Sequence, residues 1–220
     1  MLKQFIEKAQ GRTTFLEHEV KGLLKDMGFS VPKGRFIRAG ERLPEDLGLV
    51  YPLIAKVSSQ KISSKSDVHG LRAGLRNESE LGSAVEELSH IEHAEGVLVE
   101  EMAPRGVEVI VGGVHDRQFG PVMMFGLGGI FVEIFKDVSF GLAPLSRDDA
   151  LWMIDEVKGK KLLEGYRGSV PVDREALEEL LISVSGIMAT GLIGEIDLNP
   201  VVLYPEGAMV LDAKMKLHLS

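Results

Sequence analysis

Two apolar runs that follow each other near the middle of the sequence decide the fold class: residues 96–102 (GVLVEEM) and residues 107–111 (VEVIV). Both runs are short, rich in valine and bounded by glycine or proline, which is typical of strands. They predict a pair of strands, and residues 115–121 have the turn chemistry of a loop between the second of these strands and the next. Residues 121–125 and 130–135 have the same character, so we expect them to continue the sheet.

The sequence before these strands mixes helices with strands. Apolar residues at three- and four-residue steps predict a helix over residues 16–27, which ends at Gly28. Residues 51–57 (YPLIAKV) predict a buried strand. The serine, lysine and glycine content of residues 58–70 predicts a loop, and a second helix is expected over residues 79–93.

The sequence after the central strands predicts two helices and a hairpin. Ser146 and Asp173 each stand where a helix N-cap would, directly before a periodic apolar stripe. Residues 193–204 and 209–213 then predict the two strands of the hairpin. The order of elements favours an α+β fold with largely antiparallel sheets.

Length and composition exclude several classes of protein. The 220 residues are 45% hydrophobic and 26% charged, which is enough for a buried core, and the change of pattern predicts subdomains of residues 1–94 and 95–220. A net charge of −8 argues against nucleic-acid binding, and the lack of cysteine excludes disulfides and thiolate sites. No apolar run is long enough to span a membrane and the N-terminus lacks the apolar core of a signal peptide, so we expect a cytoplasmic protein.

Three residues of the first half are candidates for phosphate chemistry. Lys56 lies inside the predicted strand and Lys65 in the loop after it. A buried ammonium group is costly unless an anion meets it, and a loop of this composition suits phosphate oxygens. The alternative is that Lys56 pairs with a nearby carboxylate. His69 lies in the same loop, either as a carrier of a phosphoryl group or as an ordinary surface histidine.

The two central strands carry further polar candidates. Glu100 and Met102 end the first strand, and Glu108 lies within the second. Such a strand suits an adenine site, in which backbone groups bind the base and a carboxylate binds the ribose. Exposed carboxylates at a sheet edge are also common without any such role.

The hairpin carries a sharper pattern. Alternation places Glu195, Asp197 and Asn199 on one face of a strand, and we expect Asp212 on the partner strand. Oxygen ligands without histidine or cysteine describe a site for a hard cation, with Mg²⁺ and nucleotide phosphates as the first choice. The alternative is a polar strand facing solvent, although Asp and Asn are uncommon within strands.

These motifs together resemble the ATP-grasp part of the ADP-forming acyl-CoA synthetases. The resemblance spans residues 15–215 and is carried, in chain order, by Lys56 and residues 65–70 (KSDVHG), 96–102, 119–122 (FGPV), 125–130 (FGLGGI), 136–138 (KDV), 165–168 (GYRG) and 195–200 (EIDLNP). It implies an ATP-grasp fold, with two α/β subdomains whose mainly antiparallel sheets sandwich the nucleotide. The length resembles that of a separate β subunit.

The resemblance also implies a reaction and a partner. It implies an acid–thiol ligase, of the acetate–CoA ligase type, that couples acyl-CoA + ADP + phosphate to acid + CoA + ATP through an acyl phosphate and phosphohistidine. The β subunit passes the phosphoryl group to ADP with Mg²⁺. The implied partner is an α subunit that carries the CoA site and its own phosphohistidine, in an α2β2 complex.

Site residues follow from the same resemblance. His69 matches a second phosphate carrier, and Asp197 either orients it or binds the metal. The nucleotide-binding positions are Lys56, Lys65, Glu100, Met102 and Glu108, and the magnesium ligands are Asn199 and Asp212, with Asp197 as a possible third. One position departs from the family. Members of the family commonly have the motif His-Lys-Ser-Asp in this loop, and here Ser64 takes the place of the histidine.

Two other functions remain open from the sequence. A carboxylate–amine ligase on the same nucleotide-binding fold would bind acyl phosphate directly and need no phosphohistidine. A nucleotide-binding regulator would keep the fold without any catalysis. The oxygen ligands at positions 197, 199 and 212 argue against the regulator, because a protein that only binds nucleotide need not keep them.

Overall fold

The computed structural model describes residues 1–62, 64–129, 136–166 and 170–218 and divides the chain into two units. The small unit comprises Leu16–Gly22 and Pro32–Pro104. The large unit comprises Met1–Phe15, Leu23–Val31 and Arg105–Ser220. The chain therefore passes into the large unit at Arg105, whereas the sequence placed the division between residues 94 and 95. The first helical segments contribute to both units.

The small unit is built on a four-stranded antiparallel sheet with the strand order β1-β4-β2-β3. Its strands and helix are β1 (Gly34–Arg38), β2 (Leu53–Ser58), β3 (Leu71–Leu75), α3 (Glu78–Ser89) and β4 (Gly96–Glu101). The first turns of α2 (Glu17–Asp26) also belong to this unit.

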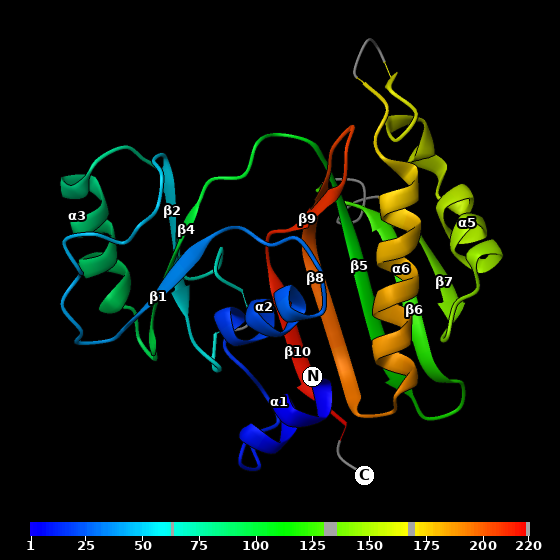
Figure 1. The fold of residues 1–220 in the computed structure, drawn as a ribbon, viewed down its shortest axis with the longest axis horizontal. Helices are drawn as coiled ribbons and strands as arrows, with labels where there is room; N and C mark the ends of the chain where they lie inside the picture. Colours follow the sequence, from blue (N-terminus) through cyan, green and yellow to red (C-terminus); the bar gives the residue numbers. More distant parts are fainter. Residues whose placement is uncertain (63, 130–135, 167–169, 219–220) are drawn as a thin grey trace. The chain divides into compact units, whose positions relative to one another are not determined.

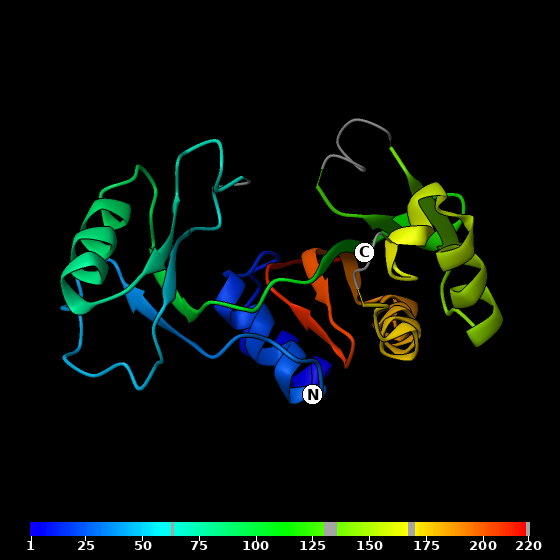
Figure 2. The same cartoon turned by 90° about the horizontal axis from the view of Figure 1, so that it is seen from above.

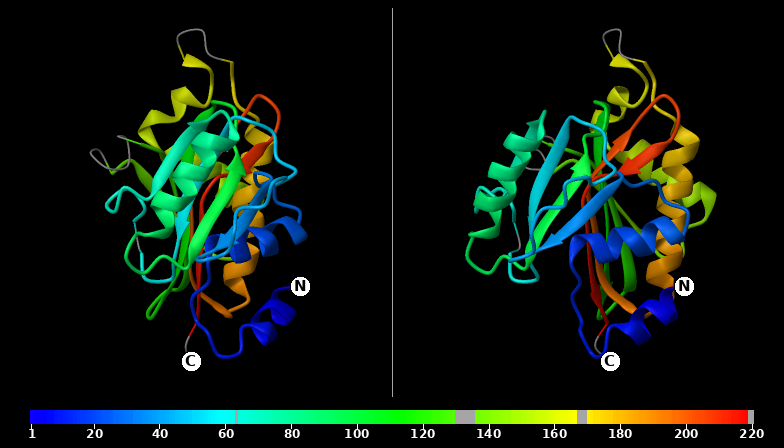
Figure 3. Two further views of the ribbon diagram at one scale, coloured as in Figure 1. Left: turned by 90° about the vertical axis from the view of Figure 1, so that its left-hand side faces the viewer. Right: turned by 60° about the vertical axis from the view of Figure 1, so that its left-hand side comes forward.

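One face of the small sheet packs against α3, which lies along it in Figures 2 and 3. This face holds the core, formed by apolar residues of the strands and of α3: Ile37, Leu53, Ala55, Leu75, Leu81, Ala84, Val85, Leu88, Val97 and Val99. Because side chains alternate along a strand, Lys56 of β2 and Glu100 of β4 point to the opposite face. Gly34 of β1 pairs with Glu100, and a Cβ there would lie 2.6 Å from the Glu100 Cγ. A glycine is therefore needed beside Glu100.

The large unit is built on a six-stranded antiparallel sheet (Figure 1). The strand order is β10-β8-β5-β6-β7, and β9 pairs with β8. Its elements are α1 (Leu2–Lys8), β5 (Val107–Asp116), β6 (Gly120–Leu127), β7 (Val138–Leu142), α5 (Arg147–Glu156), the 3₁₀ helix η1 (Lys158–Leu162), α6 (Arg174–Ala189), β8 (Ile193–Leu203), β9 (Ala208–Val210) and β10 (Ala213–Leu217). Within the described parts of the chain, no helix is long and apolar enough to cross a membrane.

The helices of the large unit begin where the sequence predicted. The Ser146 side chain caps α5 in a capping box with Asp149, and the Asp173 carboxylate caps α6 by accepting from the Ala176 amide at 3.0 Å. In Figure 1, α6 lies along β5 and β6. Its predicted apolar stripe is buried: Leu177, Leu180, Leu181, Val184, Ile187 and Met188. The two caps and the stripe are confirmed.

The prediction that the two central runs pair with each other is wrong. β4 pairs with β1 and β2 in the small unit, whereas β5 pairs with β6 and β8 in the large unit. The connection between them does not form a hairpin, and its Gly106 lies against β8. A Cβ on Gly106 would lie 2.4 Å from the Leu203 carbonyl oxygen.

Other predicted elements agree with the structure or differ at their ends. The first helix is α2, followed by Gly28 with a φ of 95°. The second helix is shorter than expected and is capped by Asn77. The predicted hairpin is present as β8 and β9, but Asp212 lies in the gap between β9 and β10 rather than in a strand. The strand expected over residues 130–135 lies outside the described residues.

Candidate functional site

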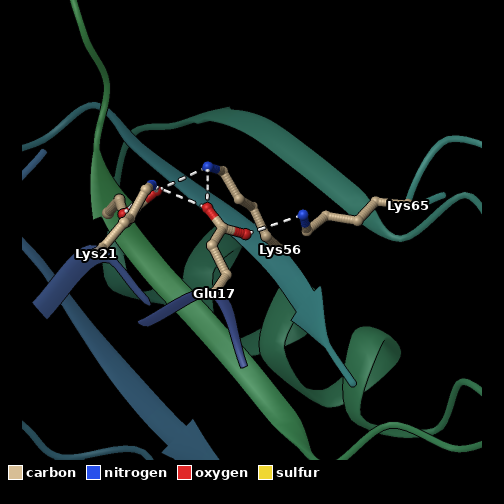
Figure 4. A network of polar contacts seen from close by, with 5 residues as sticks. Glu17, Lys21, Lys56 and Lys65 are labelled. Carbon is tan, nitrogen blue, oxygen red and sulfur yellow. Dashed lines mark hydrogen bonds and ion pairs between the residues drawn. The ribbon is translucent and has the colours of Figure 1, made fainter. Parts of the chain in front are cut away.

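Two carboxylates and two ammonium groups form a closed ring of ion pairs in the small unit (Figure 4). The Lys56 Nζ lies 2.9 Å from Glu17 Oε1 and 2.8 Å from Glu100 Oε2. The Lys21 Nζ lies 2.9 Å from Glu17 Oε1 and 2.6 Å from Glu100 Oε1. Positive and negative groups therefore alternate around the ring. All four residues are buried.

A third lysine joins this ring from the loop after β2. The Lys65 Nζ lies 2.9 Å from Glu17 Oε2, and its side chain is 13% exposed. Figure 4 shows the Glu17 carboxylate between the lysines. We call these five residues (Glu17, Lys21, Lys56, Lys65 and Glu100) the lysine–glutamate cluster. Three positive and two negative charges leave it with a formal net charge of +1.

Glu17 is held in its charged form by its neighbours. Burial alone would raise the pKa of its carboxyl group, but the ammonium groups of Lys56, Lys21 and Lys65 outweigh burial and bring the pKa well below its ordinary value. Glu17 is therefore a carboxylate at any pH near neutrality. This anion explains how a lysine can lie buried in β2.

Local structure places each member of the cluster. Glu17 and Lys21 lie one turn apart on α2, and side chains at this spacing are neighbours on a helix surface. Lys56 pairs in register with Leu98, and Glu100 lies two residues further along β4, so Lys56 and Glu100 are diagonal neighbours on one face of the sheet.

The loop that carries Lys65 is closed by backbone hydrogen bonds. The Gly70 amide donates to the Lys65 carbonyl oxygen at 2.7 Å, and the Val57 amide donates to the Gly70 carbonyl oxygen at 2.8 Å. A Cβ on Gly70 would lie 2.3 Å from Val57 Cγ1, so only glycine fits at this point. The loop thereby returns to β2 close to Lys56.

His69 is an exposed residue of the same loop, with a φ of 50° that side-chain-bearing residues rarely adopt. Its carbonyl oxygen accepts a hydrogen bond from Arg72 Nη1 at 2.8 Å, and the Arg72 Nε donates to Glu87 at 3.0 Å.

Met102 follows β4 and is 40% exposed, and its sulfur lies 3.1 Å from the backbone nitrogen of Gly74.

The large unit carries the predicted oxygen ligands. Asp197 and Asn199 share one face of β8. Ile196 and Leu198 alternate with them along the strand and are buried on the opposite face. The backbone N–H of Asn199 donates to the backbone carbonyl oxygen of Asp212 at 3.2 Å, which brings these two residues side by side. The shared face is as predicted, whereas Asp212 reaches Asn199 from the segment between β9 and β10 rather than from a partner strand.

These three residues fit a hard cation by their chemistry. Within the part of the chain that the structure describes, no group of three His, Cys, Asp or Glu residues lies close enough to hold a metal ion. Asp197, Asn199 and Asp212 together supply two carboxylates and one amide oxygen, and such oxygens are ligands that Mg²⁺ accepts.

Glu108 lies on β5, where it is exposed and pairs in register with Val202.

Sequence reasoning missed Glu17 and Lys21. A signal for them was present, since the two charges lie four residues apart beside the apolar stripe of Leu16, Val20 and Leu24. Of the predicted residues of the small unit, the structure brings Lys56, Lys65 and Glu100 together. It also gives Lys56 two carboxylate partners, Glu17 and Glu100, as the alternative for this residue required; its role towards phosphate stays a prediction.

The chain has a four-stranded antiparallel sheet covered by a helix and a larger antiparallel sheet covered by helices, which places it in the α+β class. Residues 7–217 match the model of the ATP-grasp domain family, and the chain belongs to this family.

Two curated relatives cover nearly all of the chain. It is 41% identical over 226 residues to the β subunit of acetate–CoA ligase (ADP-forming) I from Pyrococcus furiosus, covering 98% of this chain and 97% of that subunit. It is 44% identical over 203 residues to acetate–CoA ligase (ADP-forming) II from Archaeoglobus fulgidus, covering 91% of this chain. The chain spans only 30% of that longer relative.

Solved structures of one enzyme match the whole chain. The dinucleotide-forming acetyl-coenzyme A synthetase 1 of Ca. Korarchaeum cryptofilum, in complex with coenzyme A and Ca-AMPCP, has a TM-score of 0.91 and 43% identity, covering 99% of this chain and 100% of that chain. The same enzyme with coenzyme A and Mg-AMPPCP has a phosphohistidine segment that points towards its nucleotide-binding site, with a TM-score of 0.84 and 44% identity over 98% and 99% of the two chains.

Proposed function

We propose that this chain is the nucleotide-binding β subunit of an ADP-forming acyl-CoA ligase of the acetate–CoA ligase type. The observation that carries the proposal is the end-to-end match with a β subunit of that name, at 41% identity over 97% of its length. The reaction is acyl-CoA + ADP + phosphate ⇌ acid + CoA + ATP. In it, this chain exchanges a phosphoryl group with ADP in the presence of Mg²⁺.

In the small unit, the proposed contacts to the nucleotide come from the lysine–glutamate cluster and from Met102. Lys56 and Lys65 bind phosphate oxygens, because the cluster keeps a net positive charge after its internal ion pairs. The Glu100 carboxylate contacts Lys21 and Lys56, so its contribution to nucleotide binding acts through Lys56. Met102 lies next to the adenine.

In the large unit, Asn199, Asp212 and Asp197 are the proposed magnesium ligands, and Glu108 is a proposed nucleotide contact. Bound Mg²⁺ neutralises the charge that develops on the phosphate oxygens during transfer. The chain's own part is to hold these oxygens side by side, which the backbone hydrogen bond between Asn199 and Asp212 supports.

His69 is the proposed second phosphate carrier. In the direction of ATP synthesis, a phosphoryl group held on one ring nitrogen of His69 is attacked by a terminal oxygen of ADP. The P–N bond breaks as the new P–O bond forms, and the ring nitrogen that carried phosphate keeps the electron pair. Because the other ring nitrogen holds a proton in the reacting phosphohistidine, the products are neutral histidine and ATP. The exposed side chain on a loop suits a group that must receive phosphate from a partner.

A second route is direct transfer to ADP from a phosphohistidine of the partner. Two observations favour it: Ser64 stands where the family motif has histidine, and the phosphohistidine segment of the Ca. Korarchaeum cryptofilum enzyme points towards its nucleotide-binding site. This route uses the same nucleotide and metal contacts but does not need His69.

Phosphorylation by Mg-ATP in the complex with the cognate α subunit tests both routes. We expect acid-labile phosphate on His69 in the wild type, mapped by mass spectrometry, and none on this chain in His69→Asn. Asparagine tolerates a positive φ, so the loop is kept. A His69→Asn complex that turns over at the wild-type rate would establish direct transfer. No exchange in the wild-type complex would contradict the proposed function itself.

The partner follows from the same proposal. The name of the matched relatives, a β subunit, supports an α subunit that supplies the CoA and acyl chemistry, and α2β2 is the proposed assembly. A cytoplasmic location is likewise proposed. Co-expression with a candidate α chain, followed by measurement of the mass of the complex, tests the assembly.

A further inference from the structure

One carboxylate of the lysine–glutamate cluster contacts all three lysines. Glu17 Oε1 lies 2.9 Å from the ammonium groups of both Lys21 and Lys56, and Glu17 Oε2 lies 2.9 Å from that of Lys65. Glu17 therefore joins a lysine of the loop to a lysine of the sheet. The residue comes from α2, far from both in sequence, and the reasoning from motifs did not assign it any role.

Three ammonium groups close together in a buried place are unfavourable unless an anion compensates their charge. They repel one another, and each loses hydration when it is buried. Without the charge of Glu17, the single carboxylate of Glu100 would face three positive charges. The lysines would then separate, and Lys65, on a loop and more exposed than the others, would move into solvent most easily.

We propose that Glu17 is a positioning residue for the nucleotide phosphates, which holds Lys56 and Lys65 beside each other in their charged forms. The inference rests on the proposed function, because the phosphates concerned are those of ADP or ATP. An ammonium group has three donors, so a lysine can contact Glu17 and a phosphate oxygen at the same time.

The opposite role would be that of a competitor, which occupies the lysines until a nucleotide displaces it. The ring argues against this role. Glu17 is tied to Lys21 and Lys56 by contacts of 2.9 Å, and its side chain is only 4% exposed, so it is not placed to withdraw when a nucleotide arrives.

The test compares two ligands that differ in phosphate. For the full chain, the dissociation constants of MgADP, by calorimetry, and of adenosine, by ligand-observed NMR, are measured for the wild type and two variants. Glu17→Gln is expected to weaken MgADP binding by about tenfold or more, as for the loss of a charged hydrogen-bond network, and to leave adenosine binding unchanged. Glu17→Asp keeps the charge but is one methylene shorter, so we expect a smaller loss for MgADP alone.

A matched control is Glu178→Gln in α6. Glu178 is also a buried glutamate with a basic partner, since its Oε2 lies 3.1 Å from the Arg147 Nε. It lies outside the proposed nucleotide contacts, so the ratio of the two dissociation constants should stay at the wild-type value. A change in the control equal to that in Glu17→Gln would overturn the inference.

The remaining outcomes separate the inference from the proposed function. A wild-type chain that does not bind MgADP overturns both. If the wild type binds MgADP, then equal binding, tighter binding or a parallel loss of adenosine in Glu17→Gln overturns the inference alone, and tighter binding would identify a competitor. If Glu17→Gln does not fold, Glu17→Asp decides, and an unchanged ratio of dissociation constants in that variant overturns the inference.

Discussion

The two units hold their polar groups in different ways. In the small unit, five charged side chains are buried or nearly so and form ion pairs with one another through contacts of 2.6–2.9 Å. In the large unit, Asp197 and Asn199 lie on the open face of a strand and are half-buried or exposed. The buried cluster depends on its internal ion pairs, and Lys65 is its most exposed member, whereas the polar side chains of β8 face away from the core.

The same contrast separates two ion pairs of similar length. The Lys21–Glu100 and Lys216–Glu195 contacts both measure 2.6 Å, but the side chains of the first pair are at most 5% exposed and those of the second are 57% and 45% exposed. Water screens the second pair and offers both groups an alternative partner. The contribution of each ion pair to stability therefore depends on its burial rather than on the distance between its charged atoms.

The largest effect on stability is expected for Glu17→Gln. Removal of one partner from a buried network leaves uncompensated charge, which costs about 3–5 kcal/mol in the free energy of unfolding. The matched variant in the large unit, Glu195→Gln, breaks an exposed pair and should cost less than about 1 kcal/mol. Urea unfolding of both variants measures the difference. Equal losses would show that the cluster is not a requirement of the fold.

Asp212→Asn should reverse this order, with a large effect on turnover and little on stability. The metal matters most in the transition state, so we expect the turnover number of the complex with the α subunit to fall by about 100- to 1,000-fold, with a far smaller change in the dissociation constant of ADP. The free energy of unfolding should stay within about 0.5 kcal/mol of the wild type. Equal losses of turnover and affinity would contradict the assignment of Asp212 as a metal ligand.

Elements set by local chemistry were predictable from the sequence. Ser146 and Asp173 identify the starts of two helices, because an oxygen one residue before a helix satisfies its unpaired amides. The alternation over residues 195–199 correctly placed the polar side chains on one face of β8, because a buried sheet face imposes a period of two. Each of these patterns can be recognised from a few neighbouring residues, without knowledge of contacts that are distant in sequence.

Features that depend on distant partners were not predictable in this way. The central runs were correctly assigned as strands, but their partners depend on contacts across the sheets, which a local pattern does not contain. Lys21 and Glu100 lie 79 residues apart, and Lys56 and Glu17 lie 39 residues apart. The motif that draws attention to Lys56 says nothing about where its counter-ion comes from. The individual roles of Glu108 and Met102 stay predictions.

A smaller effect is expected for the dependence of stability on pH. The pKa of Glu17 is lower in the folded chain than its ordinary value, mainly through Lys56 and Lys21 acting against burial. Its contribution to stability is therefore complete above about pH 4.5 and is lost as the pH falls below that, towards the folded-state pKa. The difference in unfolding midpoint between the wild type and Glu17→Gln should thus shrink between pH 6 and pH 3. A constant difference would mean that Glu17 is not the group that titrates.

The smallest effect concerns the backbone conformation of the loop that carries His69. Many positions with positive φ use glycine, as at Gly120 (76°) and Gly207 (80°), whereas this loop places His69 at 50°. Glycine adopts this conformation without steric cost, although it also loses more entropy on folding. His69→Gly should therefore raise the free energy of unfolding by less than about 1 kcal/mol, whereas His69→Ala should not raise it.

Both variants should lose the acid-labile phosphate if His69 is the carrier. A chain that is more stable with glycine but keeps histidine at a strained position exchanges stability for function. If His69→Gly and His69→Ala have the same stability, the conformation of this loop is not strained and supplies no reason of its own to assign His69 a function. Urea unfolding and phosphate labelling of the same two variants then decide between a carrier and an ordinary loop residue, because only the labelling responds to the imidazole itself.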